Sequence, residues 1–315
     1  MIQGVNPDRH DIGILSLDQR VRLYAAGVDA VWATILPIFA VIAVGYWLTA
    51  RGTDPATLAD LAVRITSPAL LFSLLSDTSL DASRFGVLAG GTVAIAAGTA
   101  TLAGVYVRAT AVGRGFLLPA VFFNGGNMGL ACCRLAFGPA GLEAAAVPFV
   151  TIALLTSFFG IWIAKGRNGL GEALRLPLLW GASGGLALAV TGTELPASVM
   201  EPIRMLGAMA VPLMLITLGV QLRRLAIGEV GHSLVAVALR MGGGFACAWL
   251  FVTALGVGGV DRGVLLLMSV MPAAVINSMI AQRYRTDPAL VASAVVLGTL
   301  ASLVSIPLVL LRAVG

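Results

Sequence analysis

Long apolar runs separated by short polar stretches dominate the chain from residue 30 to residue 311. Most of these runs approach the roughly 20 apolar residues that an α-helix needs to cross the hydrocarbon core of a bilayer. We therefore predict an all-α integral membrane protein with ten transmembrane helices. The predicted spans are residues 30–48, 58–75, 85–107, 116–137, 144–164, 176–191, 199–222, 233–257, 264–282 and 288–311.

Short motifs recur in the two halves of the chain. LPI at residues 36–38 opens the first predicted span and LPL at 176–178 opens the sixth, while LEAAAV at 142–147 matches LVASAV at 290–295. Because each half holds an odd number of spans, the second copy must cross the membrane in the opposite direction, as in the inverted repeats of many transporters. Chance matching of Ala- and Leu-rich helices is the alternative.

The repeat gives a simple domain organisation. Residues 1–29 are a polar lead-in without the long apolar core of a signal peptide. Residues 30–315 form one transmembrane domain, with a first repeat at about 30–165 and a second at about 170–312.

Two predicted spans are interrupted at corresponding places. The stretch FFNGGNMGLA at residues 122–131 carries two asparagines and three glycines, and at an offset of 148 residues it falls on Met271-Pro272 and the residues that follow. Glycine costs about 1 kcal/mol and proline about 3 kcal/mol in a helix interior, and unpaired backbone cannot face lipid. Paired interruptions of this kind indicate the binding site of a transporter.

We accordingly expect a substrate site at these two interruptions. Close packing of glycines, and an asparagine that satisfies carbonyls freed by the proline, are the structural alternatives. The expected substrate-binding residues are Asn124, Gly125, Gly126, Asn127, Pro272 and Asn277.

Further polar or kinking residues lie inside predicted spans. Pro68 and Pro212 each interrupt a span near its middle and are candidates for a hinge or for the pathway. Arg64 and Arg134 are candidates to pair with an anion, because charged residues within spans are often functional. The alternative is that both arginines reach a membrane interface along their flexible stems.

Composition excludes several classes of function. With 58% hydrophobic and 11% charged residues, the chain cannot form an ordinary water-facing surface. The net charge of +5 arises from residues that lie mostly between spans, so we expect no nucleic-acid partner. Neither histidine lies in a span, and no HExxH or GxSxG motif is present, so we expect no metal, no cofactor and no enzymatic activity.

Arg and Lys are distributed unevenly between the two sides. The loops after odd-numbered spans hold Arg51, Arg108, Arg114, Lys165, Arg167, Arg175, Arg223, Arg224, Arg283 and Arg285. The other side, outside the lead-in, holds Arg84, Arg134, Arg204, Arg262 and Arg312. Since short basic loops stay in the cytoplasm, we predict a plasma membrane protein, in a bacterium its inner membrane, with both termini extracytoplasmic. The three arginines of the lead-in argue against this orientation.

Three groups of residues carry a family resemblance over about residues 30–311. They are residues 124–129 followed by Phe137-Gly138, residues 211–213 with 218–222, and Met271-Pro272 with residues 281–284. In these the chain resembles the auxin efflux carrier family of permeases, which includes bacterial carriers proposed for malonate, malate and related organic acids.

The resemblance implies a fold like that of the bile acid:sodium symporters. It implies an inverted five-plus-five repeat with two broken helices that cross near the membrane midplane, where Asn124 and Pro272 would lie, and a moving half that slides against a scaffold. The chain departs from the family in one respect. Phe123 and Ala131 stand where prolines are often found, so glycine must provide the break.

These features predict a permease for a small organic anion, most plausibly a carboxylate. Helix amino ends and amide donors favour negative charge, and no acidic residue lies midway through a span. The alternative is a channel or sensor with the same polar interruption. A coupling ion, Na⁺ or H⁺, and a homodimer are left open.

Overall fold

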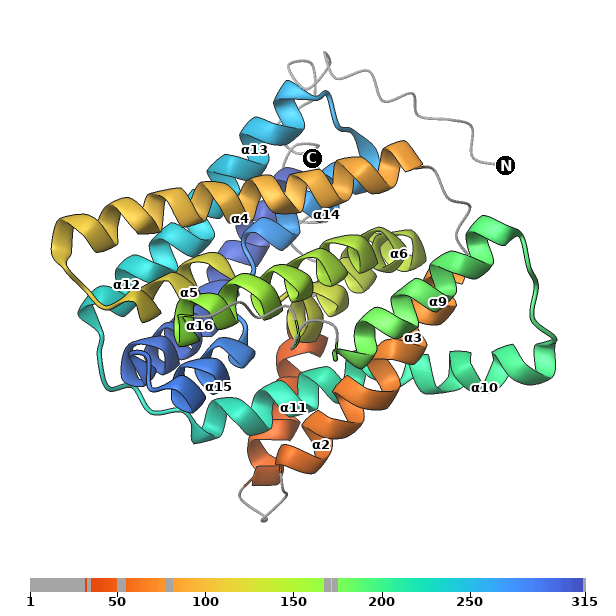
Figure 1. Ribbon diagram of the computed structural model, residues 1–315, viewed down its shortest axis with the longest axis horizontal. Coiled ribbons are helices and arrows are strands. Elements are labelled where there is room, and N and C mark those ends of the chain that lie inside the picture. The colour runs from red at the N-terminus through yellow and green to blue at the C-terminus, as the bar shows by residue number, and fades with distance from the viewer. Residues whose placement is uncertain are drawn as a thin grey trace, which may run out of the picture.

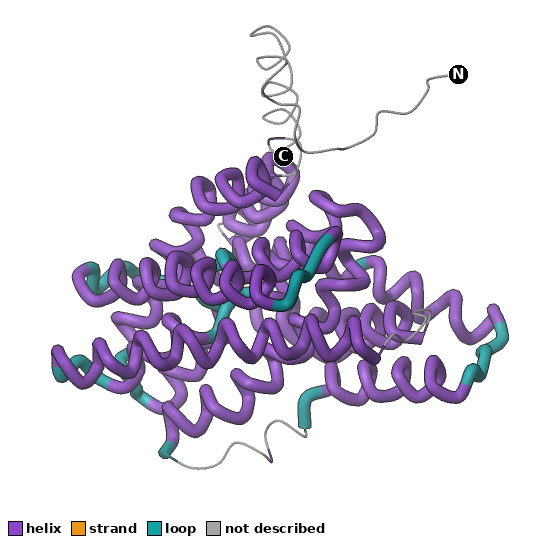
Figure 2. Tube along the Cα trace, turned by 90° about the horizontal axis from the view of Figure 1, so that it is seen from above, coloured by secondary structure: helices purple, strands orange, loops and turns teal. Residues whose placement is uncertain are grey.

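The computed structural model describes residues 32, 35–49, 55–76, 82–166, 171 and 175–313. Apart from one isolated bridge, the described residues form helices, turns and loops (Figures 1 and 2). The all-α prediction is confirmed. The predicted lead-in at residues 1–29 lies outside the described residues.

Fifteen α-helices, four π-helical turns and one short 3-10 helix build the described part of the molecule. They are the helix Ile35–Thr49, α2 (Pro55–Leu61), η1 (Ala62–Thr66), α3 (Ser67–Ser76), α4 (Ala82–Thr110), η2 (Arg114–Phe116), α5 (Leu117–Val121), η3 (Gly125–Leu130), α6 (Ala131–Leu155), η4 (Thr156–Gly160), α7 (Ile161–Lys165), α9 (Pro177–Thr191), α10 (Ala197–Ala208), α11 (Ala210–Arg224), α12 (Gly231–Ala238), η5 (Leu239–Gly243), α13 (Gly244–Ala254), α14 (Gly259–Ser269), α15 (Val275–Tyr284) and α16 (Pro288–Ala313).

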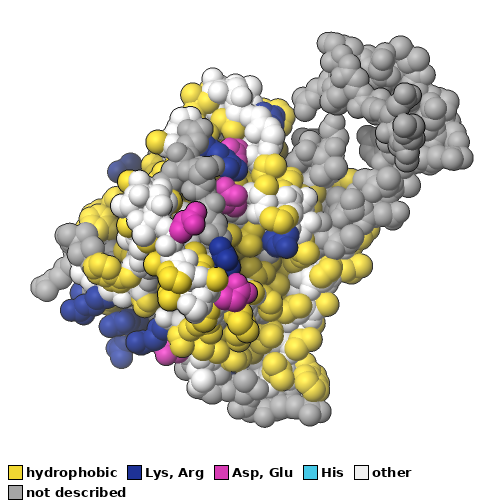
Figure 3. Space-filling model, turned by 90° about the vertical axis from the view of Figure 1, so that its right-hand side faces the viewer, with side chains coloured by type: hydrophobic (Ala, Val, Ile, Leu, Met, Phe, Trp, Pro, Cys, Tyr) yellow, Lys and Arg dark blue, Asp and Glu magenta, His cyan; other side chains and the backbone are white. Residues whose placement is uncertain are grey.

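Six segments of the described chain are long and apolar enough to cross a membrane, so this is a multi-pass membrane protein. They are Thr57–Ser76, Ala82–Thr110, Gly125–Lys165, Ala197–Arg224, Gly231–Ala254 and Pro288–Leu311. Two shorter apolar helices are Ile35–Thr49 and Pro177–Thr191. In Figure 3, hydrophobic side chains cover much of the right and lower parts of the coloured surface, whereas charged side chains gather through its centre and at its left.

Predicted spans 116–137 and 264–282 do not form single helices. Each is divided into two shorter pieces, α5 and η3 in one case and α14 and α15 in the other. The long segment Gly125–Lys165 also changes direction at Gly138, whose φ of 68° and ψ of −155° are not helical. Past this turn the chain runs back along itself, because Phe149 packs beside Gly126.

Two groups of helices are distinguished by their packing (Figure 1). The first, which we call the outer group, contains Ile35–Thr49, α2, α3, α9, α10 and α11. Glycines allow very close approach within it: Gly45 lies against the backbone of Ile216, and Gly185 against the backbone of Phe72. Small residues have this role in many membrane helix pairs.

The second group, which we call the central group, contains α4 to α7 and α12 to α16. Its core surrounds the interruptions, and α14 is buried from Gly263 to Ser269. Arg84 of α4 forms ion pairs with Asp261 of α14 at 2.9 Å and with Glu143 of α6 at 3.2 Å. These pairs connect three helices of the same group.

Candidate functional site

The two interrupted segments meet in the centre of the molecule. After α5, residues 122–124 are not helical, and after α14 the same is true of residues 270–274. Phe123 and Ala273 form an antiparallel bridge. The Asn124 N–H donates to the Pro272 carbonyl at 2.7 Å and the Ala274 N–H donates to the Phe122 carbonyl at 3.1 Å. We call these two segments the paired breaks.

Asn124 controls the start of the helix after the first break. Its side-chain oxygen accepts a hydrogen bond from the Asn127 N–H at 3.1 Å, which satisfies one of the free donors in the first turn. Its side-chain Nδ2 is buried and has no hydrogen-bond partner, and the residue is only 4% exposed. A buried amide donor without a partner is costly, so this atom is suited to a bound acceptor.

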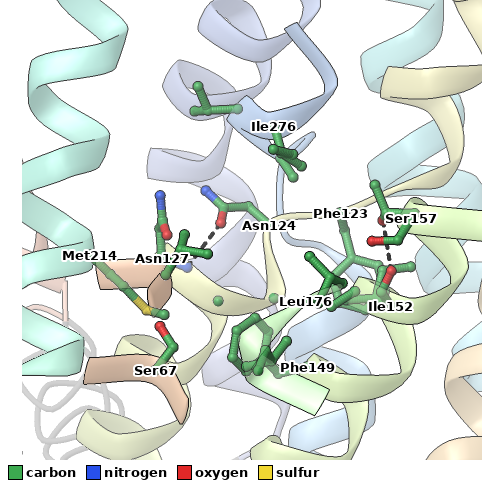
Figure 4. Close-up of a pocket in the computed structure, with 18 residues that line it drawn as sticks. Ser67, Phe123, Asn124, Asn127, Phe149, Ile152, Ser157, Leu176, Met214 and Ile276 are labelled. Atoms are coloured by element: carbon green, nitrogen blue, oxygen red, sulfur yellow. Dashed lines mark hydrogen bonds between the residues drawn. The ribbon is translucent and has the colours of Figure 1, made fainter. Parts of the chain in front are cut away.

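A cavity of about 190 Å³ opens beside Asn124, between the central group and the outer group (Figure 4). Figure 4 shows Asn124 and Asn127 with Ser67 and Met214 of the outer group nearby. The cavity is lined by Val63, Ser67, Phe123, Asn124, Gly125, Gly126, Asn127, Phe149, Ile152, Ala153, Thr156, Ser157, Leu176, Leu178, Met214, Ala274, Val275 and Ile276.

Four of the expected substrate-binding residues therefore line the cavity: Asn124, Gly125, Gly126 and Asn127. Each of the two glycines leaves room for an apolar neighbour. A Cβ at Gly126 would lie 2.7 Å from the Phe149 ring, and one at Gly125 would lie 3.2 Å from Ile152. The glycines therefore help to shape the cavity wall as well as to break the helix.

The other two expected residues have a different position. Pro272 is buried in the second break and contributes its carbonyl to Asn124. Asn277 is fully buried in α15, and its side-chain amide donates to the Phe122 carbonyl at 2.8 Å. Neither residue lines the cavity. Asn277 instead connects α15 to the first break.

The two arginines expected to pair with an anion lie away from the cavity. The Arg64 side chain is 69% exposed and forms an ion pair with Asp60, one helical turn earlier. Arg134 is exposed on α6. The i,i+4 spacing of Asp60 and Arg64 is a signal in the sequence for this pairing.

The two mid-span prolines lie close to the cavity without lining it. Pro68 follows Ser67, a lining residue, and its backbone packs against Gly181 of α9. Pro212 is exposed near the start of α11, two residues before the lining residue Met214. A hinge role for either proline stays a prediction.

The electrostatic environment of the cavity suits an anion. The helices that begin at Gly125 and Val275 both present their amino ends to it, and a helix amino end carries a partial positive charge. None of the lining residues is acidic or basic. Among the described residues, no group of three His, Cys, Asp or Glu side chains could hold a metal ion.

Sequence reasoning did not find the contribution of the outer group, and it did not place Arg240 at the paired breaks. Leu176 and Leu178 belong to the recurring LPL motif, but no local signal marks them, Ser67 or Met214 as cavity residues, and all four reach the cavity only through tertiary packing. Arg240 lies fully buried beside the paired breaks and donates to the carbonyls of Val121 and Ser269. Its position in the middle of an apolar span was the only signal in the sequence.

Comparison with known proteins relates the chain to membrane transporters. Residues 166–310 match the family described as membrane transport protein. An uncharacterized transporter of Methanothermobacter thermautotrophicus is 26% identical over 292 residues, covering 87% of this chain and 96% of the relative. A second, from Methanocaldococcus jannaschii, is 28% identical over 205 residues, covering 62% of this chain and 66% of the relative. These matches show that the chain is similar to membrane transport proteins, which agrees with the resemblance to the auxin efflux carrier family described above.

Proposed function

We propose that the protein is a permease for a small organic anion, with a carboxylate as the recognised group. The observation that carries this proposal is the buried, unpartnered Nδ2 of Asn124 at the wall of a cavity that faces two helix amino ends. A carboxylate oxygen would accept from this donor, and a hydrogen bond to a charged acceptor is stronger than one between neutral groups.

The rest of the lining indicates an apolar body on the substrate. Apolar side chains form most of the wall, among them Phe149, Ile152 and Ile276 of the central group and Leu178 and Met214 of the outer group. A cation would find no carboxylate there to neutralise it. At about 190 Å³ the cavity is smaller than the roughly 300–1,000 Å³ typical of drug-sized ligands. A small carboxylic acid suits this space.

The geometry of the breaks supports an inverted repeat. The two hydrogen bonds between them are equivalent under an offset of 150 residues, because Asn124 corresponds to Ala274 and Phe122 to Pro272. An approximate two-fold axis between Phe123 and Ala273 would exchange the two segments. If each break joins the two pieces of one span, the helices form ten spans. The basic residues then put both termini on the extracytoplasmic side of a plasma membrane.

The outer group has the same symmetry. Gly45 packs against Ile216, and Gly185 packs against Phe72. The offset of 140 residues that joins the first and sixth predicted spans converts Gly45 into Gly185. Their partners Phe72 and Ile216 are 144 residues apart. The proposed repeat therefore relates the two contacts to each other.

The division into two groups supports an elevator mechanism. Ion pairs of Arg84 connect helices within the central group, and close glycine contacts connect helices within the outer group. The cavity lies between the groups, so a sliding movement of one against the other would carry a bound anion across the membrane. In this mechanism the central group moves and the outer group is the scaffold.

Counterflow in liposomes tests this proposal and separates a carrier from a channel. We expect purified protein to take up radiolabelled malonate, malate or indole-3-acetate with saturation, and to accelerate uptake when the same acid is preloaded inside. The same acids should raise the thermal midpoint of the detergent-solubilised protein, while amines and sugars should not. Flux without saturation or counterflow would indicate a channel, and stabilisation by a cation alone would exclude anion recognition.

A further inference from the structure

Arg240 is the most deeply buried charged residue of the described chain, with 1% of its surface exposed. It lies in η5, between α12 and α13, and its guanidinium reaches the paired breaks. Nη1 donates to the Val121 carbonyl at 2.6 Å and Nη2 donates to the Ser269 carbonyl at 3.2 Å. Its Cζ lies 5.2 Å from the centre of the Phe123 ring, and Phe123 lines the cavity.

The two acceptors have a common position in their helices. Val121 is the last residue of α5 and Ser269 is the last residue of α14. Carbonyls at a helix carboxyl end lack partners within the helix and carry a partial negative charge. In the interior of a membrane protein they must be satisfied by another group. Arg240 satisfies one carbonyl at each of the two ends at once.

No carboxylate forms an ion pair with Arg240 in the part of the chain that the structure describes. The positive charge is therefore balanced by backbone carbonyls and by the face of an aromatic ring. Gly244 makes space for the guanidinium, since a Cβ at this position would lie against Nη2 and 2.6 Å from the Ser269 carbonyl. The site is built around a planar, forked cation, a shape that lysine does not provide.

In many transporters the carbonyls at the carboxyl ends of broken helices coordinate a coupling cation. We propose that Arg240 is a tethered cation that takes this position, so that the paired breaks bind an anion without a free Na⁺ ion. It is a positioning residue: it holds α5 and α14 and makes the field around Phe123 and Asn124 more positive. This inference rests on the proposed anion permease, and it specifies that Na⁺ does not participate in anion binding.

The first experiment needs no substrate. In the ligand-free Arg240→Ala protein, we expect millimolar guanidinium chloride to raise the thermal midpoint, because the free cation can enter the vacated site. The unmodified protein and a Gly242→Ala control should show no such rise. Gly242 is a suitable control because it lies on the same helix with nothing within 4 Å of the position of an added Cβ. If guanidinium does not specifically raise the thermal midpoint of Arg240→Ala, the proposal of a tethered cation is overturned.

The second experiment measures anion binding by the shift in midpoint with malonate, malate and indole-3-acetate. Arg240→Ala should weaken the apparent affinity at least about tenfold, in the range of a lost charged interaction, and guanidinium should restore part of it. Arg240→Lys keeps the charge, so its apparent affinity should lie between those of the unmodified protein and Arg240→Ala. Affinity unchanged in Arg240→Ala would overturn the proposal.

The unmodified protein gives a test that does not depend on folding of any variant. The shift produced by the best acid should be the same in sodium chloride and in choline chloride. A requirement for Na⁺ would overturn the inference but leave the anion permease intact. No shift with any acid, together with guanidinium rescue of Arg240→Ala, would instead reject the proposed substrate class and retain Arg240 as the cation of the breaks.

Discussion

The first break ends at Asn124 and is followed by Gly125 and Gly126, whereas the second contains Pro272 followed by two alanines. Both segments leave the helical conformation, and they form the same hydrogen bonds to each other. Their side chains differ, however. The first break and the turn after it contribute Asn124 and Asn127 to the cavity, and the second break and the turn after it contribute Ala274, Val275 and Ile276.

This difference indicates a division of roles between two equivalent segments. Glycine breaks a helix without filling space, so polar groups beside it can face a ligand. Proline breaks a helix by geometry and removes a donor, and here its segment holds the first break in place through the Pro272 carbonyl and Asn277. We infer that the first break recognises the substrate and that the second supports it.

Of the substitutions that test this division of roles, Asn124→Asp should have the largest effect on uptake. Aspartate keeps an oxygen that can accept from the Asn127 N–H, so the helix start is preserved. It removes the Nδ2 donor and places a negative charge where the anion would bind. We expect uptake of the acid to fall about a hundredfold or more, with the protein still folded. Initial rates in liposomes and the thermal midpoint measure the two effects, and uptake equal to that of Gly242→Ala would remove Asn124 from the site.

Much of this arrangement could be predicted from hydrophobic patterning. The two interruptions were visible because glycine, asparagine and proline are unusual in long apolar runs. The predicted register was offset by two residues. Motif matching gave 148, whereas the bridge pairs Phe123 with Ala273, which are 150 apart. The matched motifs lie beyond the turn at Gly138 in one half and beyond Asp287 in the other, so turns of different length account for the shift.

Side-chain direction could not be predicted in the same way. Asn277 and Asn127 are both asparagines in the first turn after a break, yet one is buried against Phe122 and the other lines the cavity. Arg240 reaches an acceptor 119 residues away in the sequence. Such contacts depend on how whole helices pack, and one sequence contains no local pattern that specifies them.

Asn277→Ala tests the supporting role of the second break and should have an intermediate effect. It removes the buried hydrogen bond to the Phe122 carbonyl, which costs about 1–3 kcal/mol of stability. We expect a lower thermal midpoint with an apparent affinity for the acid within about threefold of the unmodified value. A large loss of affinity at an unchanged midpoint would instead assign Asn277 to the binding site.

The smallest effects should come from the arginines outside the cavity. If the anion is recognised at the paired breaks, positive side chains that lie away from the breaks are not needed for binding. Arg64 is exposed and paired with Asp60, and Arg134 is exposed on α6. An exposed pair at this spacing contributes only about 0.3–0.5 kcal/mol of stability, so Arg64→Gln should still fold. Because neither arginine lines the cavity, Arg64→Gln and Arg134→Gln should change uptake by less than about twofold. Liposomes with matched amounts of each protein provide the measurement. A tenfold loss in either variant would show that an arginine approaches the substrate during transport, and recognition could then no longer be assigned to the first break alone.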